Sequence, residues 1–314
     1  MRLRDLVDTY IAFKRSLGMD FHSDAKVLRR FCRAMGDINV TDVQPEAVHA
    51  FIAGTGPVTA NWRQKFSVLG SLYRYAIGRG FAATSPLPTA VPKFPPPLVP
   101  YIYSTSELKR LLAATDTLQT PRSLLRALTF RTLLLLLYGT GMRVGEALSL
   151  TLHDTDLASR ILTVRDSKFF KTRLVPIGPQ LTGALIHYEH RRLQLPLPAG
   201  DSSAFLCTRT GNRLHHTEVS KVFRRVREIA GVHRESTARY QPRIHDIRHT
   251  AAQHRLIAWY RAGADVQHLL PQLATYLGHV EIGSTQHYLS MTPELLHEAS
   301  LRFEQYAQPE ARHE

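Results

Sequence analysis

The sequence predicts a mainly α-helical protein of two domains, with a small antiparallel β-sheet in the second domain. Three observations predict this. Apolar residues recur at helical spacing along most of the chain, a proline-rich stretch separates two parts, and two short β-branched runs flank a polar turn. The chain has 314 residues, a length that favours two domains, and its hydrophobic content of 44% is sufficient for globular cores.

The first predicted domain, residues 1–84, contains four amphipathic helical patterns. Ser23 is placed to cap the second helix, Gly36 to end it, and Pro45 stands in the first turn of the third, where proline is tolerated. The polar sides carry basic residues, which is typical of solvated helices and also fits contact with a nucleic acid backbone. The predicted helices cover residues 3–18, 23–36, 44–54 and 59–80.

A proline-rich linker is predicted at residues 85–100. The stretch "TSPLPTAVPKFPPPLVP", residues 84–100, contains seven prolines, which forbid a helix and favour an extended tether. The second domain is therefore expected to span residues 101–314.

The second domain begins with a capping box, in which Ser104 precedes Glu107 by three residues. A leucine-rich helix follows at about 122–138. Two β-branched runs, 161–164 and 173–177, predict a hairpin, with a third strand at 204–211. Helices resume at about residue 217, and the final helix carries a predicted apolar stripe. That stripe contains Leu295, Leu296, Ala299 and Phe303.

The charge of the chain points to a polyanionic partner. Lys and Arg total 40 against 26 acidic residues, which gives a formal net charge of +14, and the sequence pI is near 10.1. Nucleic acid is the leading candidate. A membrane-surface protein is the alternative, but we find neither a basic amphipathic anchor nor a lipidation signal. No apolar run is long enough to span a bilayer, and the first residues do not resemble a signal peptide.

The cysteines and histidines do not indicate a metal site. Cys32 and Cys207 are far apart, and without an export signal we expect free thiols in a reducing cytoplasm. The 16 histidines are scattered, and no cysteine pairs accompany them at zinc spacing.

A glycine-containing turn is predicted before Arg143. In "LYGTGMRVGEALSL", residues 137–150, Gly139 and Gly141 are expected to break the leucine-rich helix. Arg143 would then start the next helix, with Glu146 one turn on to steady it. The alternative is an ordinary surface Arg–Glu pair, because such pairs are common and weak.

The segment "RIHDIRHTAA", residues 243–252, places three cationic or titratable side chains on one helical face. His245, Arg248 and His249 stand at i, i+3 and i+4, while Ile247 is directed toward a core. Such a face is not expected to be a packing face. It is either solvated or surrounds an anion, and a phosphate fits better than a metal because a guanidinium matches two phosphate oxygens.

Two further segments carry candidate site residues. In "SKFFKTR", Lys168 and Arg173 belong either to an exposed basic turn or to a loop that carries a lysine into a groove. In "YLGHVEIGSTQHYLS", His279 and Tyr288 stand nine residues apart, so on one unbroken helix they would point to opposite faces. They can share a site only if the chain bends, and Gly283 is where it bends most easily. The alternative is a core tyrosine and a surface histidine.

The combined pattern resembles the tyrosine recombinases of the phage integrase superfamily. The matching segments are "GTGMRVGEALSL", "SKFFKTRLVPI", "HDIRHT" and "YLGHVEIGSTQHY", and the resemblance covers residues 105–300, the integrase-like catalytic domain. Residues 1–84 resemble the helical core-binding domain of that family only in length, helicity and position. The segment 251–275 is several residues longer than in compact Xer-type members.

The resemblance implies a role for each candidate residue. Tyr288 would attack the scissile phosphate and form a 3′-phosphotyrosyl link. Arg143 and Arg248 would clamp the phosphate, and His279 would donate a hydrogen bond to it.

Proton transfer is assigned in the same way. The resemblance implies that Lys168 is the general acid for the departing 5′-oxygen and that His245 is the acid/base for the tyrosine proton. Glu146 would orient the helix of the first arginine. The chemistry implied in this way needs no cofactor, neither a metal ion nor ATP.

The partners implied by the resemblance are nucleic acid and further copies of the chain. The two domains would close as a clamp around double-stranded DNA that carries a specific recombination site. A homotetramer would act on two duplexes, a related recombinase is a further candidate partner, and no membrane is involved. The expected location is the cytoplasm, in association with the nucleoid.

Two other functions remain open at this point. A type IB topoisomerase or a hairpin-forming resolvase uses the same tyrosine chemistry with a different outcome. A non-catalytic DNA-binding architectural protein or repressor is the alternative from another class, although a protein that only binds DNA has no need for the full set of six residues.

Overall fold

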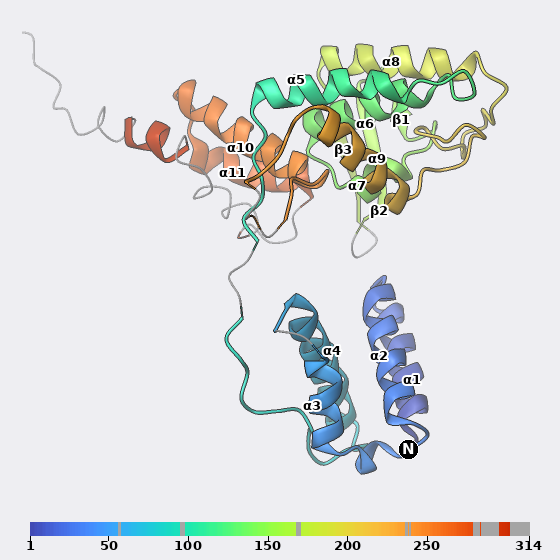
Figure 1. Ribbon diagram of the computed structural model, residues 1–314, viewed down its shortest axis with the longest axis vertical. Helices are drawn as coiled ribbons and strands as arrows, with labels where there is room; N and C mark the ends of the chain where they lie inside the picture. Colours follow the sequence, from blue (N-terminus) through green and yellow to red (C-terminus); the bar gives the residue numbers. More distant parts are fainter. Residues whose placement is uncertain are drawn as a thin grey trace, which may run out of the picture. The chain divides into compact units, whose positions relative to one another are not determined.

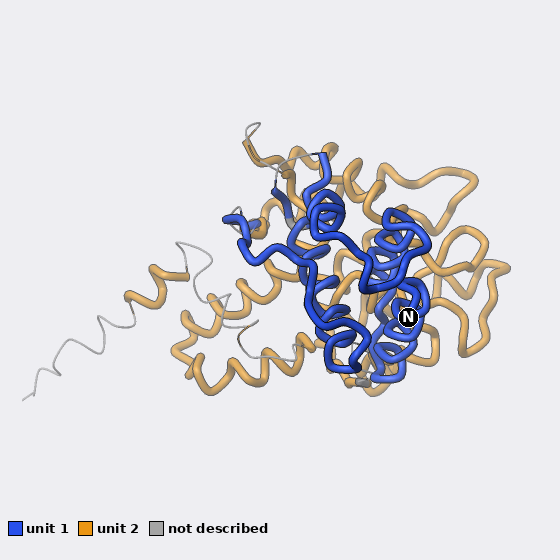
Figure 2. The backbone as a smooth tube through the Cα atoms, turned by 90° about the horizontal axis from the view of Figure 1, so that it is seen from below, with its two compact units in different colours: residues 1–98, 168–171 blue, residues 99–167, 172–314 orange. Residues whose placement is uncertain are grey.

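The computed structural model describes most of the chain as two compact units (Figures 1 and 2). Unit 1 comprises residues 1–98 and, of the described residues that follow, Lys171; unit 2 comprises residues 99–167 and the described residues from 172 onward. The described residues are 1–55, 58–94, 98–167, 171–235, 238, 240–278, 283 and 295–301. Within them the fold is mainly α-helical with a three-stranded sheet, as the sequence predicts.

The described residues of unit 1 form four α-helices around one apolar core. Leu3, Leu28 and Leu69 are fully buried there, and Tyr10 lies edge-on to Phe21 at 5.7 Å between ring centroids. The apolar stripes that the sequence shows on each helix meet in this core, since burial of those stripes drives the packing. The helices are α1 (Leu3–Ser16), α2 (His22–Met35), α3 (Pro45–Ala53) and α4 (Ala60–Gly78), with a 3₁₀ turn at Val40–Asp42.

The helix starts in unit 1 agree with the sequence at one position and differ at another. Pro45 is the first residue of α3, as predicted. The prediction that Ser23 caps α2 is wrong, because the helix begins at His22 and its N-cap is Phe21 in the left-handed conformation. Phe21 instead packs against the core, and this packing sets the start of the helix. Gly36 ends α2 as expected.

The proline-rich stretch contacts both units at its ends. Leu87 and Phe94 pack against the unit 1 core, with the Phe94 ring 5.5 Å from that of Trp62. At the other end, the Val99 carbonyl accepts hydrogen bonds from Tyr240 and, at 2.7 Å, from Arg234 of unit 2.

Unit 2 surrounds a core that joins helices and sheet. One face of the sheet contributes Leu162, Val164 and Val175, all nearly fully buried. The sheet order is β1–β2–β3, and Thr155 of β1 pairs with Leu162 of β2 in antiparallel register. The strands are β1 (Thr155–Asp156), β2 (Ile161–Ser167) and β3 (Lys171–Pro176).

The third strand is not where the sequence predicts it. Residues 204–211 make only isolated bridges, Thr151 to Ala204 and Cys207 to Arg213. Their buried side chains, such as Phe205, fill the core without a partner strand. The third strand is β1, a two-residue segment too short for a periodic signal.

The helices of unit 2 pack around α6, which is buried on most sides and contacts α8 and α10. Ser104 and Glu107 form the predicted capping box of α5. The remaining helices are α5 (Thr105–Ala114), α6 (Arg126–Thr140), α7 (Val144–Ser149), α8 (Pro179–Leu193), α9 (His216–Ile229), α10 (Asp246–Arg261) and α11 (Val266–Leu277), with a 3₁₀ turn at Thr115–Leu118.

The ends of α6 differ from the prediction by a few residues. The helix begins at Arg126 and not near 122, because Thr120 and Ser123 bridge in a turn that contains Pro121. Only Gly141, with φ +62°, ends the helix, whereas Gly139 lies inside it.

The start of the C-terminal tail packs on its own unit. Leu295 is 1% exposed in a cluster with α10 and α11, and Arg261 Nε donates to Glu298 Oε1 at 2.8 Å. Leu296 is 55% exposed, so the predicted apolar stripe is wrong at that position. Phe303, also assigned to the stripe, lies outside the described residues.

The cysteines and the lengths of the helices complete the description of the fold. Cys32 and Cys207 are both free, as expected. Among the described helices, none combines the length and apolar character required to cross a membrane.

Gly141 offers a test of how the end of α6 is held. A β-carbon at Gly141 would lie 2.5 Å from Leu277 Cδ2, in a backbone conformation that disfavours L side chains. We expect Gly141→Ala to lower the free energy of unfolding by about 2 kcal/mol or more. The measurement is urea denaturation followed by circular dichroism.

Gly145→Ala is the matched control. Gly145 lies in α7 with nothing within 4 Å of the added carbon. Removing a helical glycine should therefore raise stability by about 0.5–1 kcal/mol. Equal stability of the two variants would contradict the role given to Gly141.

Candidate active site

Arg143 stands at the start of α7, where the sequence places it. Its backbone N–H donates to Glu146 Oε2 and its Nη1 to Glu146 Oε1, both at 2.8 Å. The apolar residues Val144, Ala147 and Leu148 are buried on the other side of the helix. The Arg143 side chain is 39% exposed. Packing of α7 therefore holds its backbone, while part of the side chain faces solvent.

Glu146 is the buried partner of two arginines. Arg173 Nη1 donates to its Oε1 at 3.1 Å and Arg173 Nη2 to its Oε2 at 2.8 Å, in addition to the bonds from Arg143. Burial alone would raise the pKa of this carboxyl, but the hydrogen bonds from Arg173 and Arg143 outweigh it and lower the pKa to about 2. Glu146 is therefore ionised at neutral pH, although its side chain is only 10% exposed.

Arg173 is the member of this cluster whose role the sequence did not reveal. We expected a residue of a basic turn, but its side chain is only 13% exposed. It lies on β3 two residues before buried Val175, and residues two apart share one face of a strand. This two-residue spacing from a buried position was the sequence feature that could have predicted a buried Arg173.

The C-terminal end of α11 contacts the same two arginines. Arg143 Nη2 donates to the Gly278 carbonyl at 3.2 Å, and Arg173 Nε donates to the Tyr276 carbonyl at 3.3 Å. Gly278 has φ +71°, and a β-carbon there would lie 2.7 Å from Arg173 Nη1. Only a glycine permits this approach, which brings the chain to the arginines directly before His279.

Arg248 binds the turn that precedes Arg143. Its Nη1 donates to the Gly141 carbonyl at 2.7 Å. Its residue exposure is 3%, so the expectation that this face of α10 is not a packing face is wrong for Arg248. Its long apolar stem is buried while the guanidinium contacts the backbone turn. Ile247 points into the main core of unit 2, as predicted.

His245 and His249 lie together beside Arg248, with ring centroids 5.3 Å apart. His245 is the N-cap residue of α10 and is exposed. Surrounding protein atoms exclude water from part of the ring, and Arg248 repels a proton, so the pKa of His245 lies below its ordinary value. Burial, followed by the neighbouring His245, lowers the pKa of His249 to about 4. Both rings are thus poised to be neutral at pH 7.

Three predicted site residues lie outside the described residues: Lys168, His279 and Tyr288. The structure describes the strands β2 and β3 on either side of Lys168. Of the segment between His279 and Tyr288 it describes only Gly283.

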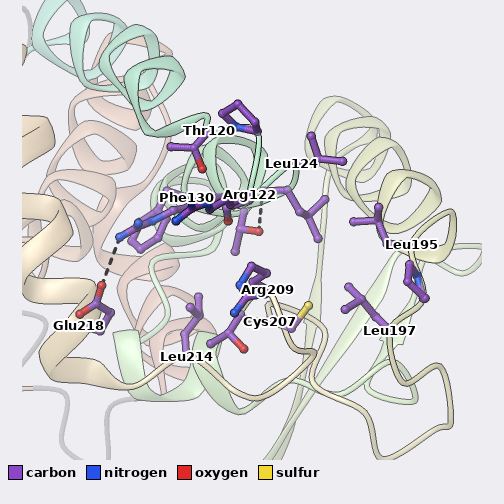
Figure 3. A pocket seen from close by; sticks show the side chains of 17 residues that line it. Thr120, Arg122, Leu124, Phe130, Leu195, Leu197, Cys207, Arg209, Leu214 and Glu218 are labelled. Atoms are coloured by element: carbon purple, nitrogen blue, oxygen red, sulfur yellow. Dashed lines mark hydrogen bonds and ion pairs between the residues drawn. The ribbon is translucent and has the colours of Figure 1, made fainter.

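A pocket of about 510 Å³ opens elsewhere in unit 2 (Figure 3). It is lined mainly by apolar side chains, and Arg126 Nη2 donates to Glu218 Oε1 across its wall at 3.2 Å. None of Arg143, Arg173, His245 and Arg248 lines it. The candidate site is therefore the arginine cluster and not this cavity.

The described part of the site brings together groups whose chemistry suits a phosphate. Arg143 and Arg248 meet at one chain reversal, 139–143, and the charges of both act on His245. Guanidinium groups pair with two oxygens of a phosphate, and neutral imidazole can accept a proton.

The comparisons with known proteins identify the family. A sequence model described as the phage integrase family matches residues 103–294. The chain belongs to the phage integrase family. The protein y4rB of Sinorhizobium fredii, named for an integrase/recombinase, is 33% identical over 306 residues, covering 96% of each chain. Tyrosine recombinase XerC of Oceanobacillus iheyensis is 29% identical over 288 residues, covering 90% of this chain and 88% of the relative.

The solved structures support the same fold for this tyrosine recombinase. The Tn1549 transposon integrase in complex with transposon right end DNA matches with a TM-score of 0.71 and 15% identity, covering 98% of this chain and 100% of that one. The lambda integrase tetramer bound to a Holliday junction matches with a TM-score of 0.64 and 17% identity, covering 92% and 77%. The family, the site-specific recombinase class and the fold predicted from the sequence are thus confirmed.

The charge of Glu146 provides a test of the cluster. Because its folded-state pKa of about 2 lies below the ordinary 4.5, its stabilisation is complete above pH 4.5 and is lost as the pH falls toward 2. The full loss should be about 3 kcal/mol in the free energy of unfolding. We expect Glu146→Gln to be destabilised at pH 7 and to depend less on pH than wild type in urea denaturation between pH 5 and 3.

Glu218→Gln is the control for this measurement. Glu218 also pairs with an arginine, Arg126, but its side chain is 51% exposed. Exposed pairs contribute little, so this variant should keep the wild-type slope. A Glu146→Gln variant with the same slope as wild type would contradict the assignment.

Proposed function

We propose that this recombinase cuts and rejoins double-stranded DNA at a specific site through a 3′-phosphotyrosyl intermediate. The observation that carries the proposal is the hydrogen bond from Arg248 to the Gly141 carbonyl, two residues before Arg143, with His245 influenced by the charge of both arginines. Two guanidinium groups of this kind can stabilise the charge of a pentacoordinate phosphorus without help from a metal ion.

The cleavage step begins with attack on phosphorus. The Tyr288 oxygen forms a bond to the scissile phosphorus while the bond from phosphorus to the 5′-oxygen breaks. His245 accepts the phenolic proton, which its low pKa permits because the ring is neutral beforehand. Lys168 gives a proton to the departing 5′-oxygen. Arg143 and Arg248 hold the non-bridging oxygens.

The joining step reverses these transfers. His279 donates a hydrogen bond to the phosphate in both directions. A 5′-hydroxyl from the partner strand attacks the phosphotyrosyl phosphorus, and Tyr288 leaves with a proton returned by His245. Because the ester conserves the bond energy, the reaction needs neither ATP nor a hydrolysed bond.

The partners follow from this chemistry and from the charge of +14. Exchange between two sites requires two duplexes, and we propose a homotetramer to hold them.

Residues 1–84 would serve as the core-binding domain and 101–314 as the catalytic domain, with 85–100 as their linker. Exposed Arg29 and Arg63 on α2 and α4 are suited to the DNA backbone. The location consistent with this activity is the cytoplasm, at the nucleoid.

The nucleophile is tested with a suicide substrate that has a nick beside the cleavage point. Wild type should accumulate a covalent protein–DNA adduct on a denaturing gel. Tyr288→Phe should bind DNA with unchanged affinity and form no adduct, because the attacking oxygen is gone.

Tyr276→Phe is the matched control, because Tyr276 is the nearest other tyrosine in the sequence. Its hydroxyl donates to the Pro176 carbonyl at 3.2 Å, and burial raises its pKa, so it is a poor nucleophile. This variant should still form the adduct. Adduct formation by Tyr288→Phe, or its loss only in Tyr276→Phe, would show that the nucleophile is misassigned.

Metal independence is tested separately. Because guanidinium groups supply the positive charge, the adduct should form in EDTA at a rate within about twofold of that in magnesium. The measurement is the single-turnover rate on the same nicked DNA. Loss of the adduct in EDTA and its return with magnesium would contradict the proposed clamp.

A further inference from the structure

We infer that Arg173 is a positioning residue of the recombinase: it acts on the reaction through Arg143 and through the segment that leads into His279. The inference rests on the proposed function and deepens it. Arg173 lies in β3, Arg143 at the start of α7 and Gly278 at the end of α11. This one side chain therefore links its own strand, which follows Lys168 in the sequence, to the start of α7 and to the chain directly before His279.

The first contact fixes the direction of Arg143. Glu146 Oε1 accepts from Arg143 Nη1 and its Oε2 from the Arg143 backbone N–H, while Arg173 binds both oxygens at 3.1 and 2.8 Å. The two-point contact from Arg173 anchors this carboxylate to β3, whereas the two hydrogen bonds from Arg143 join it only to its own helix. The anchored carboxylate in turn sets where the Arg143 guanidinium lies.

The second effect is on charge. A carboxylate beside the phosphate would repel it, and a lone Arg143–Glu146 pair would have no net charge. Arg173 adds the second cation, so the three groups together carry one positive charge. The charge of Arg143 therefore remains available to DNA. Arg173 is itself only 13% exposed, so its effect passes through its neighbours.

The third contact fixes the backbone before His279. The last carbonyls of a helix have no partner within it, and cations are favourable there. Arg173 Nε donates a hydrogen bond to the Tyr276 carbonyl, and Arg143 Nη2 donates one to the Gly278 carbonyl. An alanine β-carbon at Gly278 would lie 2.7 Å from Arg173 Nη1 and 2.8 Å from its Cζ, so the guanidinium sits directly against this turn.

The experiment measures the single-turnover rate of adduct formation on the nicked DNA, together with DNA affinity and melting temperature. Arg173→Met should slow the rate by about 100-fold with DNA affinity nearly unchanged, because misplacement of a catalytic group by about 1 Å has effects of this size. Arg173→Lys keeps the charge but not the two-point contact, and should lie between Arg173→Met and wild type.

Arg165→Met is the matched control. Arg165 is also a strand arginine paired with a nearly buried carboxylate, Asp154, at 2.5 Å, but no hydrogen bond links that pair to Glu146. Its rate should stay within about threefold of wild type, because breaking this nearly buried pair costs folding stability but leaves the hydrogen bonds of Glu146 in place. If Arg165→Met slows the reaction as much as Arg173→Met, the effect is one of stability and the inference is wrong.

A double-mutant cycle separates positioning from folding. The cycle compares Arg143→Lys with and without Arg173→Met. If Arg173 acts largely through Arg143, Arg173→Met should slow adduct formation in the Arg143→Lys variant by much less than the 100-fold expected in wild type. A purely structural role predicts that the two effects multiply, and that result would overturn the inference. Gly278→Ala, which displaces the Arg173 guanidinium without removing a charge, should reproduce part of the rate loss.

The outcome for the proposed function is read independently. If wild type forms no adduct, or if Tyr288→Phe forms one, the proposed function fails before Arg173 is considered. If wild type forms the adduct and the Arg173 variants match the Arg165 control, only the inference about Arg173 fails.

Discussion

The buried carboxylate of Glu146 is the constraint on which the described part of the site depends. A charge in a nearly buried position is unfavourable unless it is paired and hydrogen-bonded. Glu146 meets this condition through Arg143, Arg173 and the Arg143 backbone N–H. These partners come from two segments, and both arginines extend to the end of α11. The requirement to satisfy one carboxylate therefore brings three separate parts of unit 2 together.

The chain reversal after α6 is the second fixed point. α6 is buried on most sides, so its end has little freedom. Gly141 ends the helix against Leu277, its carbonyl receives Arg248, and Arg143 follows two residues later. The two arginines are thus oriented by the same turn, one through its own backbone and the other through a hydrogen bond. Their separation is set by rigid structure and not by flexible side chains alone.

The electrostatics of this region favour an anion and a neutral base at the same time. Exclusion of water and neighbouring positive charge lower the pKa of His245 and His249, so both rings are neutral at neutral pH. The negative charge of Glu146 faces Arg143 and Arg173. A phosphate therefore meets positive charge next to an imidazole that can accept a proton, which is the combination that a phenol nucleophile requires.

The sequence by itself determined those features that depend on neighbours along the chain. Ser104 with Glu107, Arg143 with Glu146, and His245 with His249 follow from helical spacing of three or four residues, and the structure forms each pair. The order of the motifs was also sufficient to recognise the family, because it needs no knowledge of distances in space.

Only the tertiary structure decided the contacts between distant segments. Arg173 lies 27 residues from Glu146, and Arg248 lies 107 residues from Gly141. No periodicity links such positions, and both arginines were expected on exposed or unpacked faces. The N-cap of α2 at Phe21 and the absence of a strand at 204–211 have the same explanation, since burial in a core overrode the local preference. Local spacing fixes which side chains share a helix face, whereas packing of the whole unit decides which of those faces meet.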